Sequence, residues 1–249
     1  MRAGASSLRF TILQFSILIT HLPRTNRYTR TMKPQSSTAT RLASLLAALC
    51  AFAATTSLPG QDIKLPAPQR TGGMPLMEAL AKRSTARAFD ASRDLTPQQI
   101  SSLLWAAFGI NRDDGKRTAP TANNRQELDL YVLLKTGSYR YEPKDNTLVL
   151  VAEGDKREIG GTQPFVKNAP VTVLIVADFT RMNGSDTPGN RQTASTDAGF
   201  VSQNIYLYCA SEGLANGTRG SVDRAKVAAA LSFKPTQWVA LGHSAGYAP

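Results

Sequence analysis

One segment constrains the fold of this chain more than any other: Val171–Ala177 (VTVLIVA) is an unbroken run of strand-forming residues. A strand with one face in water alternates apolar and polar residues, whereas an unbroken run is typical of a strand covered on both faces. The chain therefore needs a sheet with a packed layer on each side. Its 249 residues, 42% of them hydrophobic, are enough for one such domain or two small ones.

Helical spacing of apolar residues predicts helices on both sides of this run in the sequence. The clearest begins at Thr96, which can cap a helix that starts with Pro97 and has Gln99 to complete a capping box. Gly109 is expected to end this helix. The other predicted helices are Met74–Arg83, Thr193–Glu212 and Asp223–Leu231.

Strand patterns occupy much of the remaining sequence. Tyr139–Tyr141 and Thr147–Val151 flank a turn-forming segment and predict a hairpin, and further strands are expected at Leu130–Leu134 and Gln237–Leu241. Helices precede, interrupt and follow the strands. This order favours an α+β sandwich around a central mixed sheet.

The basic charge of the chain is concentrated at its start. The formal net charge is +11, but residues 1–53 hold seven basic residues and no acidic ones, which leaves 22 basic and 18 acidic residues elsewhere. No run of Lys or Arg is interleaved with aromatic residues, so we expect no nucleic-acid partner. The basic excess belongs mainly to this leader rather than to a binding face.

We predict that residues 1–53 are a leader containing a signal peptide that starts at Met32. Lys33 and Arg41 supply its positive region, and the apolar run Leu42–Ala54 is too short to span a bilayer. An organelle transit peptide is the alternative, because the segment is rich in Arg, Ser and Thr and free of acids. We favour export, with a periplasmic location.

The mature chain is expected to consist of a linker and one folded domain. Residues 54–73, with several Pro and Gly, are predicted to be a flexible linker, and residues 74–249 to form the domain, without a membrane span. The domain holds one cysteine, Cys209, and one histidine, His243. This inventory argues against an internal disulfide and against a metal site.

A short motif near the end of the sequence imitates a serine hydrolase. Gly242-His243-Ser244-Ala245-Gly246 matches the G-x-S-x-G pattern and follows a predicted strand. That nucleophile requires a helix directly after it and an acid and a histidine farther along, and none of these follows. We therefore interpret the motif as a small-residue tail after an edge strand.

The Arg83–Arg87 segment (RSTAR) is a candidate anion site. It combines two guanidinium groups with two hydroxyls where the first predicted helix ends. Guanidinium groups bind phosphate through two parallel hydrogen bonds, and hydroxyls can complete such a cradle. Taken alone, a cluster of Arg and Ser is usually an exposed helix end.

The wider sequence resembles the nitroreductase family of flavoproteins from about Met74 to Gly246. RSTARAF at 83–89 is similar to the R-x-S-x-R/K-x-F motif that opens this family. LLWAAFGINR at 103–112 and RTAPTANN at 117–124 are similar to the second helix and the R-x-A-P-S-A-x-N loop of its branch with thiazoline and oxazoline (SagB-type) dehydrogenases. Further matches follow in the family's order, at Gln163–Phe165, Ala169-Pro170, Asp197–Gly199, Gln203-Asn204, Gly213–Ala215 and Arg219-Gly220.

The resemblance implies an α+β nitroreductase-like sandwich with a central, mostly antiparallel sheet. It also implies an obligate homodimer with FMN at the subunit interface. By position, the residues implied to contact the cofactor of their own subunit are Arg83, Ser84, Thr85 and Arg87. The loop lent to the partner's cofactor is implied to carry Pro120, Thr121 and Asn124, while Gly220, with Arg219 beside it, takes the place near flavin N5.

The implied activity is that of an FMN-dependent oxidoreductase. Hydride would pass through flavin N5 in a ping-pong cycle, from NAD(P)H or another donor to a nitro, quinone or azoline-type small molecule. The flavin carries the redox chemistry, so no protein side chain is assigned as catalytic. Because NAD(P)H is scarce outside the cytoplasm, an exported flavin-binding protein without turnover is the alternative.

Overall fold

The structure, a computed structural model, describes residues 61–249. The predicted leader and the first part of the predicted linker lie outside these residues. The described strands are β1 (Ile63–Lys64), β2 (Leu128–Leu134), β3 (Gly137–Glu142), β4 (Thr147–Glu153), β5 (Val171–Asp178), β6 (Ala215–Arg219) and β7 (Gln237–Gly246). The α-helices are α2 (Leu76–Lys82), α3 (Pro97–Phe108), α4 (Pro188–Ser211) and α5 (Arg224–Ala230), and the short 3-10 helices are η1 (Ala122–Asn124), η2 (Arg157–Gly160), η3 (Pro164–Asn168) and η4 (Phe179–Arg181).

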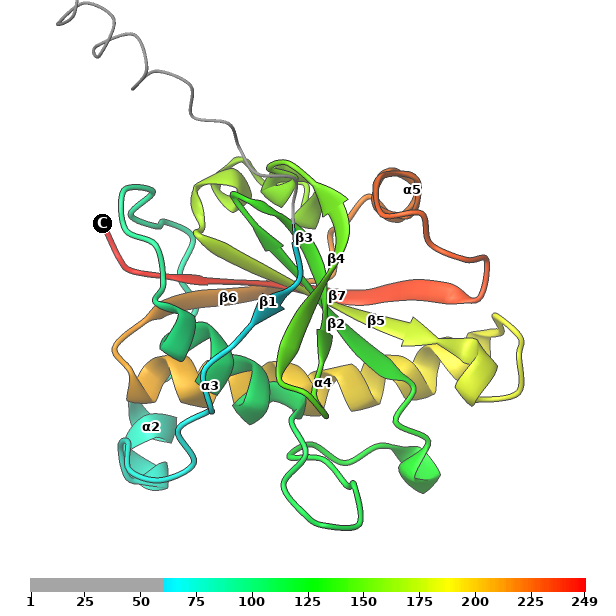
Figure 1. Cartoon of the computed structure of the whole chain (residues 1–249), viewed down its shortest axis with the longest axis horizontal. Helices are drawn as coiled ribbons and strands as arrows, with labels where there is room; N and C mark the ends of the chain where they lie inside the picture. Colours follow the sequence, from blue (N-terminus) through cyan, green and yellow to red (C-terminus); the bar gives the residue numbers. More distant parts are fainter. Residues whose placement is uncertain (1–60) are drawn as a thin grey trace, which may run out of the picture. The chain divides into compact units, whose positions relative to one another are not determined.

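The seven strands form one sheet in the order β1-β4-β3-β2-β5-β7-β6, and every neighbouring pair is antiparallel (Figure 1). The predicted hairpin is confirmed as β3 and β4. The α+β class and the antiparallel sheet are confirmed, whereas the expectation of a mixed sheet is wrong. The two strands that pair with β5, β2 and β7, both run antiparallel to it.

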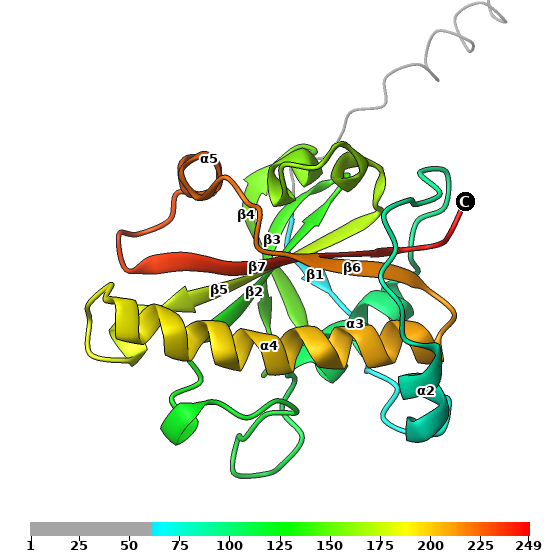
Figure 2. The ribbon, with the colours of Figure 1, turned by 180° about the vertical axis from the view of Figure 1, so that it is seen from behind.

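A layer packs on each face of the sheet, as the unbroken run in β5 predicts. Val173 and Ile175 pack in the larger core together with residues of α3 and α4. Leu174 and Val176 point the other way, into a smaller core shared with α5 and η2. Figure 2 shows α4 running along one face of the sheet, with α5 on the other.

The helices begin where side-chain caps are available. The Thr96 hydroxyl accepts a hydrogen bond from the Gln99 N–H, and the Gln99 side-chain oxygen accepts one from the Thr96 N–H, so the predicted capping box of α3 is confirmed. Helix α4 begins five residues before its predicted start, because Thr187 caps it and Pro188 occupies its first turn.

The last two strands of the chain, β6 and β7, differ from the prediction made from the sequence. Strand β7 continues through Gly246 and lies between β5 and β6, so the G-x-S-x-G segment is part of an inner strand and not a tail after an edge strand. The edge on that side is β6, which was not predicted as a strand because Asn216 and Gly217 have low strand propensity and the segment lacks an apolar run.

Part of the segment expected to be a linker belongs to the folded body. Strand β1 pairs with β4, and the Leu65 side chain is buried in the larger core. The Leu65 N–H donates to the Asn146 carbonyl over 3.1 Å, and the Ser101 hydroxyl donates to the Pro66 carbonyl over 2.6 Å. Residues 61–66 therefore close the outer edge of the sheet.

We expect Leu65→Ala to lower the free energy of unfolding by about 2 kcal/mol, because the substitution removes buried methyl groups and leaves a cavity. The exposed neighbour Lys64 provides the control, since Lys64→Ala should change stability by less than about 0.5 kcal/mol. Urea unfolding of both variants measures the difference. Equal stability of the two variants would mean that residues 61–66 act only as a linker.

Candidate functional site

The Arg83–Arg87 segment runs from the end of α2 alongside strand β6. The Ala86 N–H donates to the Asn216 carbonyl over 2.7 Å. A Cβ atom on Gly217 would lie 2.7 Å from the Ala86 carbonyl oxygen, so this approach requires glycine on β6. Gly217 lowers the strand propensity of β6, but its missing side chain allows the predicted phosphate-binding segment to lie against the sheet edge.

Tyr206 on α4 holds the Arg83–Arg87 segment through its hydroxyl and its ring. Its hydroxyl lies 2.9 Å from Thr85 Oγ1 and accepts the Thr218 N–H over 3.1 Å. The Arg83 guanidinium carbon lies 5.1 Å from the centre of the Tyr206 ring, a cation–π distance. Tyr206 was not predicted as a site residue, because it lies at the margin of the apolar stripe of its helix.

Positive charge is available at this segment. Arg83 is half-buried, Arg87 and Ser84 are exposed, and neither arginine forms an ion pair with a carboxylate within residues 61–249. Unpaired guanidinium groups next to hydroxyls are suited to an anionic ligand.

The second predicted segment, Pro120–Asn124, forms a loop before β2. Pro120 and Asn124 are exposed, and the Thr121 hydroxyl accepts the Gln126 N–H over 2.9 Å. The Ala122 N–H donates to Asp197 Oδ2 on α4 over 2.9 Å. Asp197 thus holds this loop as Tyr206 holds the Arg83–Arg87 segment.

The two predicted segments contact different sides of α4. Asp197 and Tyr206 are nine positions apart, which corresponds to about 14 Å along the helix and about half a turn around it. Both are buried, and they lie at the two margins of the helix face that packs on the sheet. Within one chain the two segments therefore do not face a common point.

Arg219 and Gly220 lie at the end of β6 and differ in exposure. The Arg219 side chain is buried, and its guanidinium donates to the carbonyls of Gly160 and Gly217 and to the Ser244 hydroxyl. Burial lowers the pKa of Arg219 to about 10, which leaves it protonated at neutral pH. This side chain turns into the protein, and a contact between Arg219 and the cofactor stays a prediction.

Gly220 itself is exposed, and apart from its two chain neighbours no described residue has an atom within 4 Å of the place where its Cβ would be. Open space next to this backbone is compatible with a planar ligand ring. Of these predicted cofactor residues, Arg219 has a buried side chain. Gly220 and the Arg83–Arg87 segment lie at the surface.

A fully buried histidine supports this region from the sheet. His243 Nδ1 lies 3.1 Å from Ser202 Oγ, and its Nε2 lies 3.0 Å from Asn216 Oδ1. Burial, and then the charge of Arg219, lower the pKa of His243 to about 3, so the ring is neutral. With Ser244 buried beside it and bonded to Thr172, the G-x-S-x-G segment has a structural role, and its serine is not exposed as a nucleophile.

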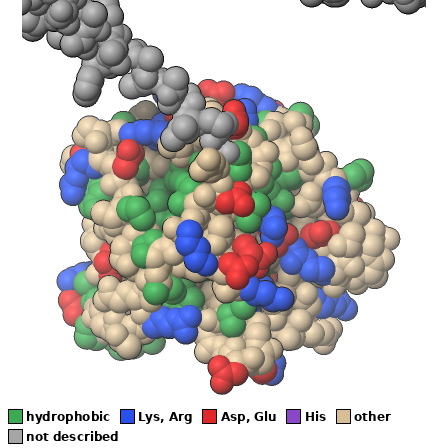
Figure 3. All heavy atoms as spheres, viewed as in Figure 1, with side chains coloured by type: hydrophobic (Ala, Val, Ile, Leu, Met, Phe, Trp, Pro, Cys, Tyr) green, Lys and Arg blue, Asp and Glu red, His purple; other side chains and the backbone are tan. Residues whose placement is uncertain are grey.

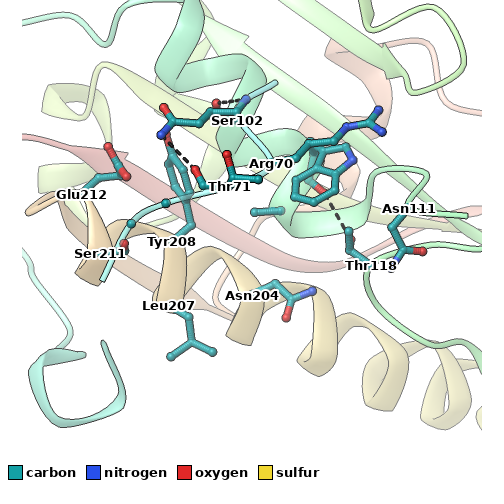
Figure 4. Close-up of a pocket in the computed structure, with 15 residues that line it drawn as sticks. Arg70, Thr71, Ser102, Asn111, Thr118, Asn204, Leu207, Tyr208, Ser211 and Glu212 are labelled. Atoms are coloured by element: carbon teal, nitrogen blue, oxygen red, sulfur yellow. Dashed lines mark hydrogen bonds between the residues drawn. The ribbon is translucent and has the colours of Figure 1, made fainter. Parts of the chain in front are cut away.

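A cavity of about 390 Å³ lies between α3, the second half of α4 and the segment before α2. Figure 4 shows Asn111 and Thr118 at one end, Ser211 and Glu212 at the other, and Asn204 on the α4 side. Cavities of this size with mixed polar and apolar linings accommodate small ligands. None of the predicted cofactor residues lines it.

On the face drawn in Figure 3, acidic and basic side chains are interspersed. Within residues 61–249 no group of three or more His, Cys, Asp or Glu side chains is placed to hold a metal ion. No helix in the same part of the chain is long and apolar enough to cross a membrane.

The buried His243 leads to a prediction on stability. Its pKa is lower in the folded state than the ordinary value of 6.5, so below about pH 6.5 the unfolded chain binds a proton that the folded chain does not. This effect lowers the free energy of unfolding by up to about 1.4 kcal/mol per pH unit as the pH falls toward 3.

We expect His243→Gln to remove this dependence, because an amide does not titrate. The free energy of unfolding of the wild type minus that of the variant should therefore shrink between pH 7 and pH 5. Urea unfolding at three pH values measures it. A difference that stays constant over this range would contradict a neutral, buried His243.

Comparison with known proteins agrees with the fold. Residues 80–247 match the model of the "Nitroreductase family". A crystal structure from Ralstonia eutropha JMP134, described as a nitroreductase, is 39% identical, with a TM-score of 0.72 over 79% of this chain and 93% of that one. A Methanocaldococcus jannaschii protein named as a nitroreductase is 28% identical over 159 residues, 59% of this chain and 78% of that protein.

A more distant structure shares the fold alone. The NADPH:FMN oxidoreductase of Vibrio harveyi, solved in complex with NAD+, is 18% identical and has a TM-score of 0.52, over 70% of this chain and 68% of that one. The family match extends from the end of α2 to the end of β7, which includes both predicted cofactor segments. From the antiparallel sheet, the two segments held by α4 and these matches, the chain belongs to the nitroreductase family.

Proposed function

We propose that this protein is an FMN-dependent oxidoreductase that works by ping-pong hydride transfer through flavin N5. The observation that carries the proposal is the surface around β6. There, two arginines without carboxylate partners lie next to hydroxyl groups in the segment that contacts Asn216 and Gly217, and the same strand leads to an open backbone position at Gly220. Membership of a family whose neighbours include flavin oxidoreductases supports the same conclusion.

The residues present fit a flavin mononucleotide. Arg83 and Ser84 would hold the phosphate, Thr85 the ribityl chain, and Arg87 the pyrimidine edge of the ring. Thr85 is oriented for this by its hydrogen bond to Tyr206, and Gly220 leaves room for the ring beside β6. When bound, FMN would supply the redox chemistry, because the protein's own side chains transfer no electrons.

The chain's part in the reaction is to bind, orient and stabilise charge. Arg87, placed by Ala86 against β6, would offset the negative charge that a reduced flavin carries at its pyrimidine edge. NAD(P)H is the proposed donor, and the proposed acceptor is a nitro, quinone or azoline-type small molecule. The similarity of residues 103–124 to the thiazoline and oxazoline dehydrogenase branch supports an azoline among these.

We infer that the working unit is a homodimer. The exposed large hydrophobic side chains of the described residues lie on only two helices, Leu76, Met77 and Leu80 on α2 and Phe200 on α4. Figure 2 shows the outer side of α4 uncovered along its length. A second copy packed there would bring its Pro120–Asn124 loop to a flavin held by the first chain, which resolves the divergence of the two segments.

The predicted leader makes export to the periplasm part of the proposal. NAD(P)H is scarce there, so a second candidate is a flavin-binding protein without turnover. The two candidates share the binding residues and differ only in whether a donor reduces the flavin.

We expect the purified protein to be yellow and its visible flavin absorbance to bleach on anaerobic addition of NADPH or NADH. A yellow protein that neither nucleotide reduces would support flavin binding without turnover. A colourless protein that binds no added FMN in equilibrium dialysis would overturn both candidates.

The Arg83→Ala variant tests the assigned phosphate contact within the same experiment. Loss of one charge-assisted hydrogen-bonding group should weaken FMN affinity by roughly tenfold or more. Lys82→Ala is the matched control, because Lys82 lies next to Arg83 but forms an ion pair with Glu78. Equal FMN dissociation constants for the two variants would refute the role of Arg83.

We expect Phe200→Asp to shift the protein from dimer to monomer and to reduce its FMN content, because a carboxylate would be buried at the proposed interface. Ala229→Asp on the exposed side of α5 is the control and should leave both unchanged. Analytical ultracentrifugation with a flavin assay measures both quantities. A dimeric Phe200→Asp variant would contradict an interface on α4.

A further inference from the structure

A buried glutamate without a hydrogen-bond donor lies directly before β2. The Glu127 side chain has an exposed fraction of 0%. Both of its carboxyl oxygens lack a partner among the N–H and O–H groups of other described residues. Its backbone is fixed, because its carbonyl accepts the Asp178 N–H over 2.8 Å. A carboxylate buried in this way is expensive unless it is neutralised.

The polar group that Glu127 faces is another carboxyl, that of Asp197 on α4, with an exposed fraction of 3%. Two carboxyl groups can bond to each other only if one of them carries a proton. Burial, together with hydrogen bonding to and repulsion by Asp197, raises the pKa of Glu127 to about 7. A single proton between the two oxygens gives Glu127 the donor that it otherwise lacks.

The surrounding cations are engaged elsewhere. Arg181 in η4 is the cation that acts on Glu127, but its guanidinium donates to the Gln126 carbonyl and pairs with Asp129 of β2. Arg117, on the other side of the loop, donates to the Gln126 side chain and to a carbonyl of α3. Asp178, at the end of β5, contacts Glu127 through its backbone N–H, and its carboxylate accepts the N–H and hydroxyl of Thr180. The pair is therefore stabilised chiefly by its shared proton.

The loop attached to this pair has a conformation that needs support. Asn123, Asn124 and Gln126 have φ angles of 54°, 53° and 48°, in the left-handed region that non-glycine residues seldom adopt. Each such residue costs about 1 kcal/mol or more, with Asn the most tolerant. The Ala122 N–H to Asp197 bond ties the loop to α4, and Glu127 is the residue by which the loop enters the sheet.

We propose that Glu127 is a positioning residue: by sharing one proton with Asp197 it holds the Pro120–Asn124 loop in place, and release of that proton to solvent loosens the loop. The unprotonated pair places two negative charges in a buried site, and separating them moves Asp197 away from the Ala122 N–H. The consequence for FMN rests on the proposed function, since this loop is the one lent to the partner's cofactor.

The sign of the pH dependence follows from the pKa of Glu127, which is higher in the folded chain than its ordinary value of 4.5. The folded chain binds this proton more tightly, so the stabilisation is complete below about pH 4.5 and declines as the pH rises toward 7. Above that value it is lost. The direction is opposite to that of His243.

Hydrogen–deuterium exchange of the peptide covering residues 120–126 tests the proposal, with rates corrected for the intrinsic pH dependence of exchange. In the wild type, protection should fall by up to roughly tenfold per pH unit between about pH 4.5 and pH 7 and level off above pH 7, as expected for opening linked to one proton. In Glu127→Gln the amide donates to Asp197 at every pH, so protection should persist at pH 8. Glu142→Gln, a half-buried control on β3, should behave like the wild type.

A second variant keeps the test decisive if Glu127→Gln folds poorly. Asp197→Asn can still accept the Ala122 N–H and can donate to Glu127, so its loop protection should also become independent of pH. Equal wild-type protection at pH 6 and pH 8, or a wild-type pH dependence in both variants, would overturn the proposal. FMN affinity measured over the same range separates the two hypotheses, because a chain that binds no FMN would still report loop protection.

Discussion

The arrangement of the whole candidate site depends on the packing of one helix, α4, against the sheet. Its buried stripe is apolar along the middle and polar at both margins, where Asp197 and Tyr206 lie. Asp197 accepts the backbone N–H of Ala122, and the Tyr206 hydroxyl is hydrogen-bonded to the Thr85 hydroxyl. Each margin of α4 thus holds one of the two segments with family motifs. Because a helix fixes the spacing and rotation of its residues, the separation of the two segments is set by the fold rather than by the loops themselves.

Much of the fold could be predicted from local patterns. The double-sided burial of β5, the hairpin of β3 and β4 and the capping box of α3 each follow from residues next to one another in the sequence. Strand β6 could not be predicted in this way, because its residues meet other requirements. Gly217 allows the close approach of Ala86, and Asn216 forms a hydrogen bond with His243. The same applies to β1, since a strand of two residues has no periodicity.

The candidate site was predictable as two segments but not as an arrangement. Motif resemblance identified Arg83–Arg87 and Pro120–Asn124, and Asp197 lies in a further segment that resembles the family. Tyr206, in contrast, carries no local signal that distinguishes it from other stripe residues. Arg219 illustrates the same limit. Its position beside Gly220 was predicted, but the inward direction of its side chain depends on carbonyl groups supplied by distant segments.

The placement of the two cofactor segments on opposite margins of α4 has a genetic consequence. In the proposed dimer each flavin draws on Arg83 of one chain and Asn124 of the other. A chain damaged at Arg83 and a chain damaged at Asn124 would each have two impaired sites when paired with themselves, yet a mixed dimer of the two would contain one site with both lesions and one site with none. Defects in the two segments would thus complement each other between alleles, whereas two defects within one segment would not.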